Sequence, residues 1–380
     1  MNKNTVHYRC EEYSLAKIEY LIEKSISDLG GIEKFVLHGE RIFLKMNLLM
    51  KKKPEEAVTT HPLVVEAVVN ILQRAGAEVT LGDSPGGPFT AGSLQRIYRA
   101  TGMEAVALKT GAKLNFDTSE VEVSFPEGKL VKRFTLCRAM VEADKLVSLS
   151  KLKTHQMMRY TGAVKVLFGA IPGLLKVEFH MKMPALQDFA DMLVDLALCV
   201  KPVLHVIDGI VGMEGHGPSS GDPRFAGSIF VGTDPFALDW AALRLMNIEP
   251  LSVPTVRSAW TRGIFREESE PFWLGDELIP VEPPFVAPEI HNQVRFRLFK
   301  KVFLPTFITE SLRPKPEFSR EICVGCGDCA RNCPPQVITL VNNFPEVDLN
   351  NCIRCFCCQE LCPHKAVRVR RSILGRLMKK

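Results

Sequence analysis

The chain has 380 residues, 46% hydrophobic and 24% charged, which is the composition of a globular protein with two or three domains. It has no low-complexity tract, no secretory pattern at its start and no apolar run of about 18 residues, so we expect a cytoplasmic protein. The net charge of +5 comes from two basic segments without acids, residues 291–304 and 368–380, which favours local docking over binding of nucleic acid.

Residues 1–285 alternate strand-like and helix-like patterns, which predicts an α/β domain with a mostly parallel sheet. In the first predicted strand, residues 41–49, Ile42 and Leu44 share one face and leave Lys45 and Asn47 on the other. A predicted helix at 62–75 follows, with a proline in its first turn. The remaining predicted elements are strands at 78–82, 145–149, 203–207 and 228–232 and helices at 185–200 and 235–246.

Polar residues lie at or just beyond the ends of these strands. Ligands of open α/β sheets bind beyond the carboxyl ends of the strands, where helix amino termini favour anions. Asp234, which precedes Pro235, is expected to be a helix cap. We expect the other polar residues at the strand ends to line one pocket. In this pocket, lysines would neutralise charge developing on a substrate, and a histidine would supply a proton. The expected catalytic residues are Lys45, Lys153, His155 and Asp208, and the expected substrate-binding residues are Asn47, Asp83, Ser84, Lys165 and Glu214.

The glycine-rich segment 209–221, which contains Glu214 and His216, is expected to be a loop that folds over a bound ligand. Its glycines do not fit a dinucleotide fingerprint, and the chain has no phosphate-loop signature, so neither NAD nor ATP is implied. The alternative use of these polar residues is a divalent metal site. Its ligands would come from Asp208, Glu214, His155, His180 and His216.

Several short motifs along the chain carry a resemblance to a known family. They are Lys45-Met46-Asn47, Thr59-Thr60-His61-Pro62, Gly82-Asp83-Ser84-Pro85, Lys151-Leu152-Lys153-Thr154-His155, Thr161-Gly162-Ala163-Val164-Lys165, Leu167-Phe168-Gly169, and Asp234-Pro235 with Asp239. The chain resembles the domain-of-unknown-function family numbered 362, whose members are often fused to ferredoxin modules. Met46 stands where the family usually has proline, and Val166 where it usually has asparagine. The resemblance implies the architecture and leaves the reaction unassigned.

Prolines mark a linker at residues 286–316, which includes a basic amphipathic segment with Ile290, Val294 and Leu298 on one stripe. The basic tail, residues 370–380, has the same character. Two interpretations remain open for these segments. They brace the following module against the large domain, which we favour, or they bind a membrane surface.

Residues 317–369 contain a repeated cysteine pattern with the spacing C-x2-C-x2-C-x3-C-P. In two-cluster proteins with this spacing, the fourth cysteine of each repeat ligates the other cluster. The pattern resembles the bacterial two-cluster ferredoxin family and implies a small α+β domain with two [4Fe–4S] clusters; a pair of zinc sites is the alternative. Cys357 breaks the spacing and is expected to be a spectator. One cluster would take Cys323, Cys326, Cys329 and Cys362, and the other Cys352, Cys355, Cys358 and Cys333.

These features together predict an iron–sulfur electron-transfer protein of a reductase-like kind. An external low-potential electron donor or acceptor protein would exchange electrons with the clusters, and a small anionic substrate or cofactor would bind in the large domain. Two alternatives stay open. The large domain could bind a partner protein without catalysis, as an electron carrier or adaptor would, or the chain could be a non-redox enzyme with structural clusters.

Overall fold

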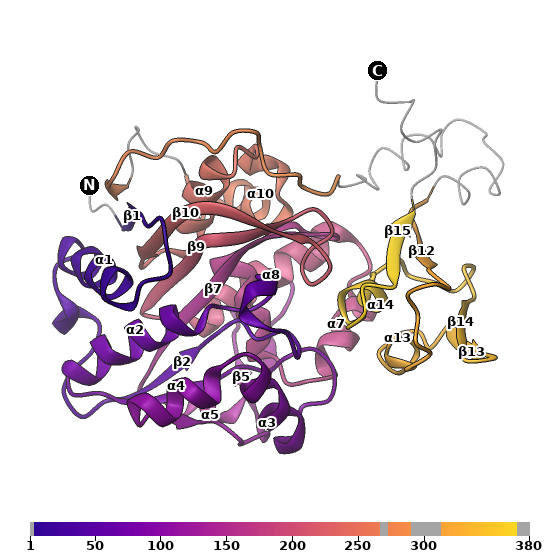
Figure 1. Ribbon diagram of the computed structural model, residues 1–380, viewed down its shortest axis with the longest axis horizontal. Coiled ribbons are helices and arrows are strands. Elements are labelled where there is room, and N and C mark those ends of the chain that lie inside the picture. Colours follow the sequence, from indigo (N-terminus) through magenta and orange to yellow (C-terminus); the bar gives the residue numbers. More distant parts are fainter. Residues whose placement is uncertain (1–3, 267–272, 290–312, 371–380) are drawn as a thin grey trace.

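The computed structural model describes residues 4–266, 273–289 and 313–370 (Figure 1). The expected amphipathic stripe at residues 290–302 and the basic tail beyond residue 370 lie outside the described residues. The rest forms a large α/β domain with a small module beside it. None of the described helices is long and apolar enough to cross a membrane.

The large domain is built on a mixed sheet that is parallel at its centre. In the described residues the sheet has nine strands in the order β11-β1-β10-β9-β7-β2-β3-β4, with β8 paired to β7. Strands β9, β7, β2, β3 and β4 are parallel neighbours, and β10 runs antiparallel to β9. The strands are β1 Thr5–Arg9, β2 Arg41–Lys45, β3 Glu78–Gly82, β4 Lys113–Leu114, β7 Lys145–His155, β8 Arg159–Thr161, β9 Leu204–Glu214, β10 Asp222–Gly232 and β11 Leu274–Gly275.

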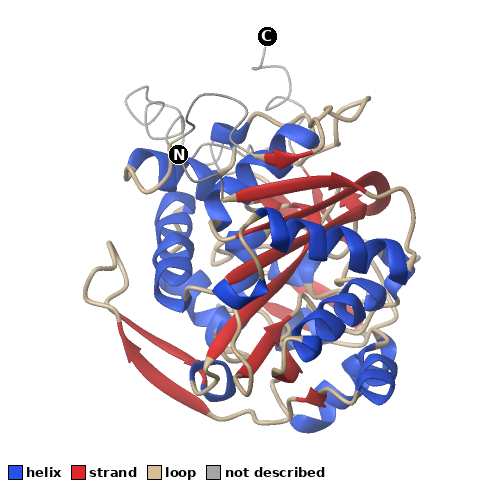
Figure 2. Cartoon of the chain, turned by 90° about the vertical axis from the view of Figure 1, so that its left-hand side faces the viewer, coloured by secondary structure: helices blue, strands red, loops and turns tan. Residues whose placement is uncertain are grey.

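Helices cover both faces of this sheet (Figure 2). On one face, α1 and α2 pack on the apolar side of β2, which includes Ile42 and Leu44. On the other face lie α8, α9 and α10. They share one apolar cluster, and α8 also contributes to a second. The predicted α/β class is therefore confirmed. The helices are α1 Leu15–Asp28, α2 Pro62–Arg74, α3 Ala91–Ala100, α4 Met103–Thr110, α5 Arg138–Val141, α6 Ala163–Val166, α7 Leu175–Lys182, α8 Leu186–Val200, α9 Pro235–Leu245 and α10 Pro254–Thr261.

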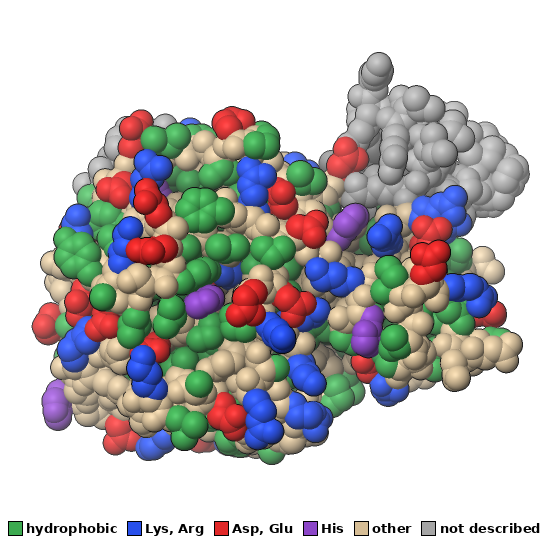
Figure 3. All heavy atoms as spheres, viewed as in Figure 1, with side chains coloured by type: hydrophobic (Ala, Val, Ile, Leu, Met, Phe, Trp, Pro, Cys, Tyr) green, Lys and Arg blue, Asp and Glu red, His purple; other side chains and the backbone are tan. Residues whose placement is uncertain are grey.

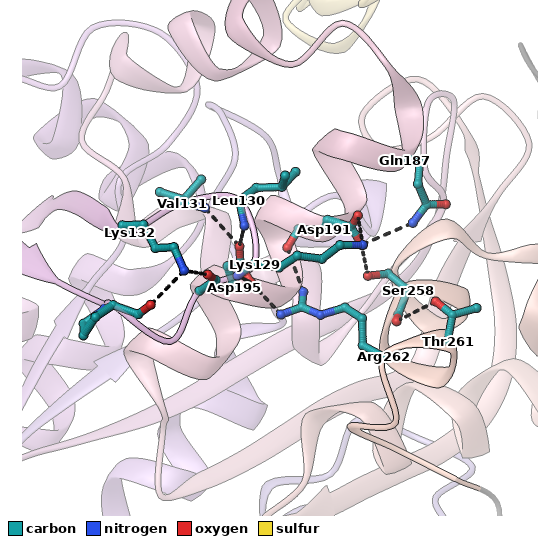
Figure 4. A network of polar contacts seen from close by, with 12 residues as sticks. Lys129, Leu130, Val131, Lys132, Gln187, Asp191, Asp195, Ser258, Thr261 and Arg262 are labelled. Carbon is teal, nitrogen blue, oxygen red and sulfur yellow. Dashed lines mark hydrogen bonds and ion pairs between the residues drawn. The ribbon is translucent and has the colours of Figure 1, made fainter.

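The turn between β5 (Glu120–Ser124) and β6 (Arg133–Cys137) is tied to α8 and α10 by a network of polar contacts (Figure 4). Asp195 accepts hydrogen bonds from three backbone N–H groups of residues 129–131 at 2.8–3.1 Å and from Arg262 at 2.6 Å. Asp191, one helical turn earlier, accepts from the Ser258 hydroxyl. Because these buried carboxylates have several donors each, they stabilise the fold at a distance from the candidate site.

Several expected elements differ from the structure in extent. The strands expected at 145–149, 203–207 and 228–232 are longer in the structure, as β7, β9 and β10. Strand β2 ends at Lys45, four residues early, where its pairing with β3 and β7 ends, and the chain then turns at Leu49, which adopts a left-handed φ of 46°. The segment 209–221, expected to be a loop, is strand as far as Glu214, because β9 continues in antiparallel pairing with β10. Only residues 215–221 form a turn. Asp234, as expected, caps α9 by accepting from Phe236 N at 2.8 Å.

The small module is held by two antiparallel strand pairs. Strand β12 (Lys315–Phe318) pairs with β15 (Val367–Arg370), and β13 (Ile338–Val341) pairs with β14 (Phe344–Val347). Two one-turn helices, α13 (Asp328–Arg331) and α14 (Cys357–Glu360), follow the two cysteine loops. This arrangement matches the predicted small ferredoxin-like domain.

Candidate functional site

A cavity of about 80 Å³ lies where the large domain meets the small module. This volume is enough for several water molecules or one small ligand. The large domain supplies most of the wall, and α14 of the small module supplies the rest. The polar and cysteine residues in the wall are Asn47, Asp83, Ser84, Lys153, His155, Thr161, Lys165, Lys176, His180, Cys357 and Glu360.

The ends of β2 and β3 form one wall through a buried ion pair. Lys45 Nζ donates to Asp83 Oδ1 at 2.8 Å, and Leu48 N donates to Asp83 Oδ2 at 2.9 Å. Gly169 packs against this pair, and a Cβ there would lie 2.1 Å from Asp83 Oδ1, so only glycine fits. Asp83 lines the cavity, whereas Lys45 is buried and is absent from the lining. Its positive charge is already balanced by Asp83.

Ser84 connects this wall to α7. Its Oγ accepts from Gly173 N at 2.8 Å and from Lys176 Nζ at 2.7 Å. Lys176 Nζ also donates to Pro85 O at 3.3 Å. Burial lowers the pKa of Lys176 to about 8. The sequence contains no motif that marks this lysine, because a short helix from a distant part of the chain places it in the cavity.

Lys153 lies near the end of β7, and its amino group has only uncharged hydrogen-bond acceptors. Nζ donates to Val58 O at 2.8 Å and to Asn47 Oδ1 at 3.3 Å. Burial lowers the pKa of Lys153 to about 7. The negative charge of Glu360 raises this pKa by a smaller amount, and the positive charge of Lys165 lowers it further. The residue is therefore close to half-protonated at neutral pH.

His155, the last residue of β7, has a defined hydrogen-bonding role. Its Nδ1 accepts from Met157 N at 3.1 Å and from Met158 N at 3.2 Å, which places the proton of the neutral ring on Nε2. Nε2 is buried without a hydrogen-bond partner in the described residues and lies 3.6 Å from Glu360 Oε2. Burial lowers the pKa of His155 well below 6.5. His155 is thus a neutral hydrogen-bond donor at pH 7, and Lys153 is better suited to supply a proton.

Lys165 brings a positive charge to the cavity from α6. Its Nζ makes no hydrogen bond in the described residues and lies 5.2 Å from the Phe168 ring. Burial lowers the pKa of Lys165. The helix is fixed by Asp239, which accepts from Ala163 N and from Val164 N at 2.6 and 3.1 Å. His180 Nδ1 is a second buried ring nitrogen without a partner in the described residues, and its residue also lines the cavity.

Three expected site residues do not line this cavity: Lys45, which is buried behind its wall, Asp208 and Glu214. Asp208 lies outside the cavity wall, where it accepts from Lys151 Nζ at 2.9 Å and from Tyr13 Oη at 2.9 Å. Glu214 lies 3.4 Å from Arg224 and accepts from the backbone N–H of Val286 at 3.0 Å. The structure therefore brings together Asn47, Asp83, Ser84, Lys153, His155 and Lys165, places Lys45 directly behind them, and separates Asp208 and Glu214 from them.

The cysteines of the small module surround two further cavities. One is lined by Cys323, Cys326, Cys329 and Cys362, and the other by Cys333, Cys352, Cys355 and Cys358. Four thiolates around each cavity fit the donor set of a [4Fe–4S] cluster. In the described residues, no three His, Cys, Asp or Glu side chains gather closely enough for a single metal ion, because each quartet surrounds a space and does not meet at one point.

Helix α14 links the second cysteine cavity to the lysine-lined cavity. Cys358 lines the former, whereas its neighbours Cys357 and Glu360 line the latter. The β9–β10 turn holds this helix, since Gln359 Nε2 donates to His216 O at 2.8 Å and Ser219 Oγ donates to Glu360 O at 2.5 Å. The glycine-rich turn thus does approach the site, and Pro218 forms part of the wall.

Two family models match the chain. The first, described as a domain of unknown function (DUF362), covers residues 42–244, and the second, a 4Fe-4S dicluster domain, covers residues 315–363. A thylakoid-associated protein of Synechocystis sp. is 31% identical over 272 residues, which are 70% of this chain and 81% of the relative. One component of an ion-translocating oxidoreductase complex from Methanosarcina acetivorans is 35% identical over 48 residues, 13% of this chain and 18% of that protein.

Two solved structures are also similar in part. The lactate racemase apoprotein from Thermoanaerobacterium thermosaccharolyticum has a TM-score of 0.39 and 13% identity, covering 60% of this chain and 54% of that one. A Thermotoga maritima protein has a TM-score of 0.33 and 12% identity, covering 57% and 55%. The chain thus spans about half the length of these two proteins. On the matches to its sequence, the chain belongs to the DUF362 family and carries an iron–sulfur-binding ferredoxin-type module at its C-terminal end.

Proposed function

We propose that the protein is an iron–sulfur reductase that transfers electrons to a small anionic substrate bound in the lysine-lined cavity. The observation that carries the proposal is the position of α14. This single turn of helix contributes Cys357 and Glu360 to the lysine-lined cavity and Cys358 to the second cysteine cavity. A ligand in the cavity would therefore lie next to the cysteine quartet, with no intervening domain.

The cysteine quartets would hold two [4Fe–4S] clusters, which supply single electrons when bound. An external low-potential donor protein would provide those electrons.

We place the protein in the cytoplasm, where thiols stay reduced. Figure 3 shows side chains of both charges mixed over one face of the described residues.

The residues of the cavity suit an anion that becomes more negative on reduction. Lys165 faces the cavity with a charge that no described hydrogen-bond acceptor satisfies. His155 offers Nε2–H to a substrate oxygen, and Lys153, with a pKa of about 7, can deliver a proton from Nζ. The docked module covers the cavity with Leu361 and Glu360, which limits the access of water.

Anion binding by the anaerobically reconstituted full chain tests this proposal. Calorimetry with acetate and with phosphate should detect binding to the wild type, and Lys165→Ala should weaken it about tenfold or more, equivalent to roughly 1.4 kcal/mol. Lys182→Ala, at an exposed position on α7, is the matched control and should bind like the wild type. Equal binding by both variants would contradict the proposal and favour an electron carrier without a substrate site.

The cluster assignment has its own test. We expect eight irons and eight acid-labile sulfides per chain, because each quartet matches one [4Fe–4S] cluster. Cys333→Ser should first perturb the cluster built on Cys352, Cys355 and Cys358, since these four residues line one cavity. Cys357→Ser should leave both clusters intact. Iron near four per chain, or zinc in its place, would contradict the assignment.

A further inference from the structure

We propose that Lys153 is a nucleophile that forms an imine with the carbonyl group of a small oxo acid, while Lys165 and His155 hold the carboxylate of that acid. This inference rests on the proposed function and narrows its substrate class from small anions to oxo acids. For such a substrate, Lys153 has a covalent role in place of the proton transfer given to it above.

The hydrogen bonds of Lys153 match those of a neutral amine. A neutral amino group has two N–H donors and one lone pair, whereas an ammonium group has three donors. Lys153 Nζ donates to two oxygens, Val58 O at 2.8 Å and Asn47 Oδ1 at 3.3 Å, and has no third acceptor in the described residues. Both N–H bonds are therefore directed into the wall. The lone pair is left for a reacting carbon in the cavity.

The other buried lysines near the site have different partners. Lys45 Nζ lies 2.8 Å from the Asp83 carboxylate, and Lys151 Nζ lies 2.9 Å from the Asp208 carboxylate. A carboxylate partner favours the ammonium form, which has no lone pair to donate. Lys176 also has two neutral acceptors, Ser84 Oγ and Pro85 O, but it lies on α7 and not beside His155 on β7. The negative charges of Glu360 and Asp83 raise the pKa of Lys153, whereas the positive charges of Lys165 and Lys151 lower it.

The anion donors lie close to this amine. His155 follows Lys153 by two residues on β7, so that both side chains point to the same face about 6–7 Å apart along the strand. His155 Nε2–H is buried and has no hydrogen-bond partner in the described residues, and Lys165 Nζ also lacks one. A ligand that satisfies these donors and reaches Lys153 must carry its carboxylate and its carbonyl only a few bonds apart. A 2-oxo acid such as pyruvate has this arrangement.

The chemistry is balanced without an oxidant or reductant. Lys153 Nζ donates its lone pair to the carbonyl carbon, a C–N bond forms, and the C=O π electrons move to the oxygen. The nitrogen loses two protons to that oxygen, which leaves as water, and a C=N bond remains. The carboxylate stays with Lys165 and His155 throughout. A protonated imine accepts electrons more readily than the parent carbonyl, which connects this step to the proposed reductase function.

Trapping the imine in the full-length protein tests the inference. The wild type is incubated with pyruvate and sodium cyanoborohydride at pH 7 under anaerobic conditions, and the modified lysines are mapped by peptide mass spectrometry. An ordinary lysine with a pKa of about 10.4 is neutral in about one molecule in 2,500 at this pH. We therefore expect the adduct on Lys153 to exceed that on any exposed lysine by more than about tenfold. Acetate in excess should suppress it.

Matched variants separate the possible outcomes. Lys153→Arg keeps a positive charge and should lose the adduct, whereas Lys176→Arg should keep it. An adduct spread over exposed lysines, or one found on Lys176 or Lys165, would overturn the inference, as would no adduct in a wild type that binds acetate. In that last case, the binding of acetate would still support the anion site of the proposed function. The mapping uses the wild type, so a variant that fails to fold does not affect its result.

Discussion

Strand β7 carries two buried lysines, Lys151 and Lys153, whose surroundings differ sharply. Lys151 Nζ is held by the Asp208 carboxylate at 2.9 Å and by Tyr13 Oη at 2.8 Å. Asp208 in turn accepts from His61 N at 2.9 Å, and the Tyr13 and His61 rings are stacked 3.7 Å apart. Lys153 has only the oxygens of an amide side chain and a peptide group.

The difference originates in the pairing of β7 with β9. Lys151 pairs with Asp208 across the sheet, and the register then shifts so that Lys153 pairs with Met213. The irregularity leaves the second lysine without a carboxylate opposite it. A buried lysine with a complete ion pair serves the fold, whereas one with neutral partners beside a cavity is available for chemistry.

The largest effect is expected from breaking the ion pair. Asp208→Ala leaves Lys151 buried without its counter-charge and should lower the free energy of unfolding by about 3–5 kcal/mol. Urea denaturation measures this change, with Asp222→Ala at an exposed position as the control. A loss below about 1 kcal/mol would mean that this pair contributes no more than a surface ion pair.

A smaller effect is expected at Tyr13. Tyr13→Phe removes a hydroxyl that donates to Asp208 and accepts from Lys151, and it should cost about 1–2 kcal/mol. Acetate binding should stay unchanged, because Tyr13 does not line the cavity. Weaker acetate binding in this variant would show that the ion pair of Lys151 is coupled to the cavity.

Lys153 should contribute little to stability at neutral pH. Lys153→Met should change the free energy of unfolding by about 1 kcal/mol at pH 7. The folded-state pKa is lowered from 10.5 to about 7, so the contribution of Lys153 is fully present above about pH 10.5 and is lost as pH falls through about 7. The wild type should therefore gain stability relative to Lys153→Met between pH 7 and pH 10. The free energy of unfolding is measured by urea denaturation at each pH. If it changed with pH in the same way for both proteins, the lowered pKa of Lys153 would be contradicted.

The smallest effect is expected at Glu360, the carboxylate that faces His155 at 3.6 Å. Glu360→Gln removes a negative charge that competes with a bound anion and should tighten acetate binding about threefold, or roughly 0.6–0.7 kcal/mol. Glu346→Gln, on the exposed side of the module, is the control for calorimetry. Unchanged or weaker binding in Glu360→Gln would place the anion away from this side chain.

The sequence predicted those residues of the site whose positions depend on their near neighbours in the chain. The cysteine spacing is local, and the two quartets line separate cavities as the spacing implies. Strand ends were also informative, because β2, β3 and β7 are parallel neighbours and bring Asn47, Asp83 and Lys153 to one edge of the sheet.

The failures have physical causes in long-range pairing. Asp208 was expected at a strand end, but β9 continues to Glu214 and its alternation turns Asp208 toward α2 and Tyr13. Lys176 and Glu360 were missed because a short helix and a separate module bring them to the cavity. No periodic pattern in the sequence predicts contacts between such distant segments.

The contact between the small module and the large domain rests on a few polar contacts and one close approach. Lys52 Nζ donates to Pro363 O at 3.1 Å, Lys365 Nζ donates to Gly221 O at 3.2 Å, and Gly86 leaves room for Leu361. Two separate proteins would need a larger surface to stay together. Because one chain carries both parts, docking of the small module is intramolecular. The few contacts between the module and the large domain are therefore sufficient to keep α14 in the wall of the cavity.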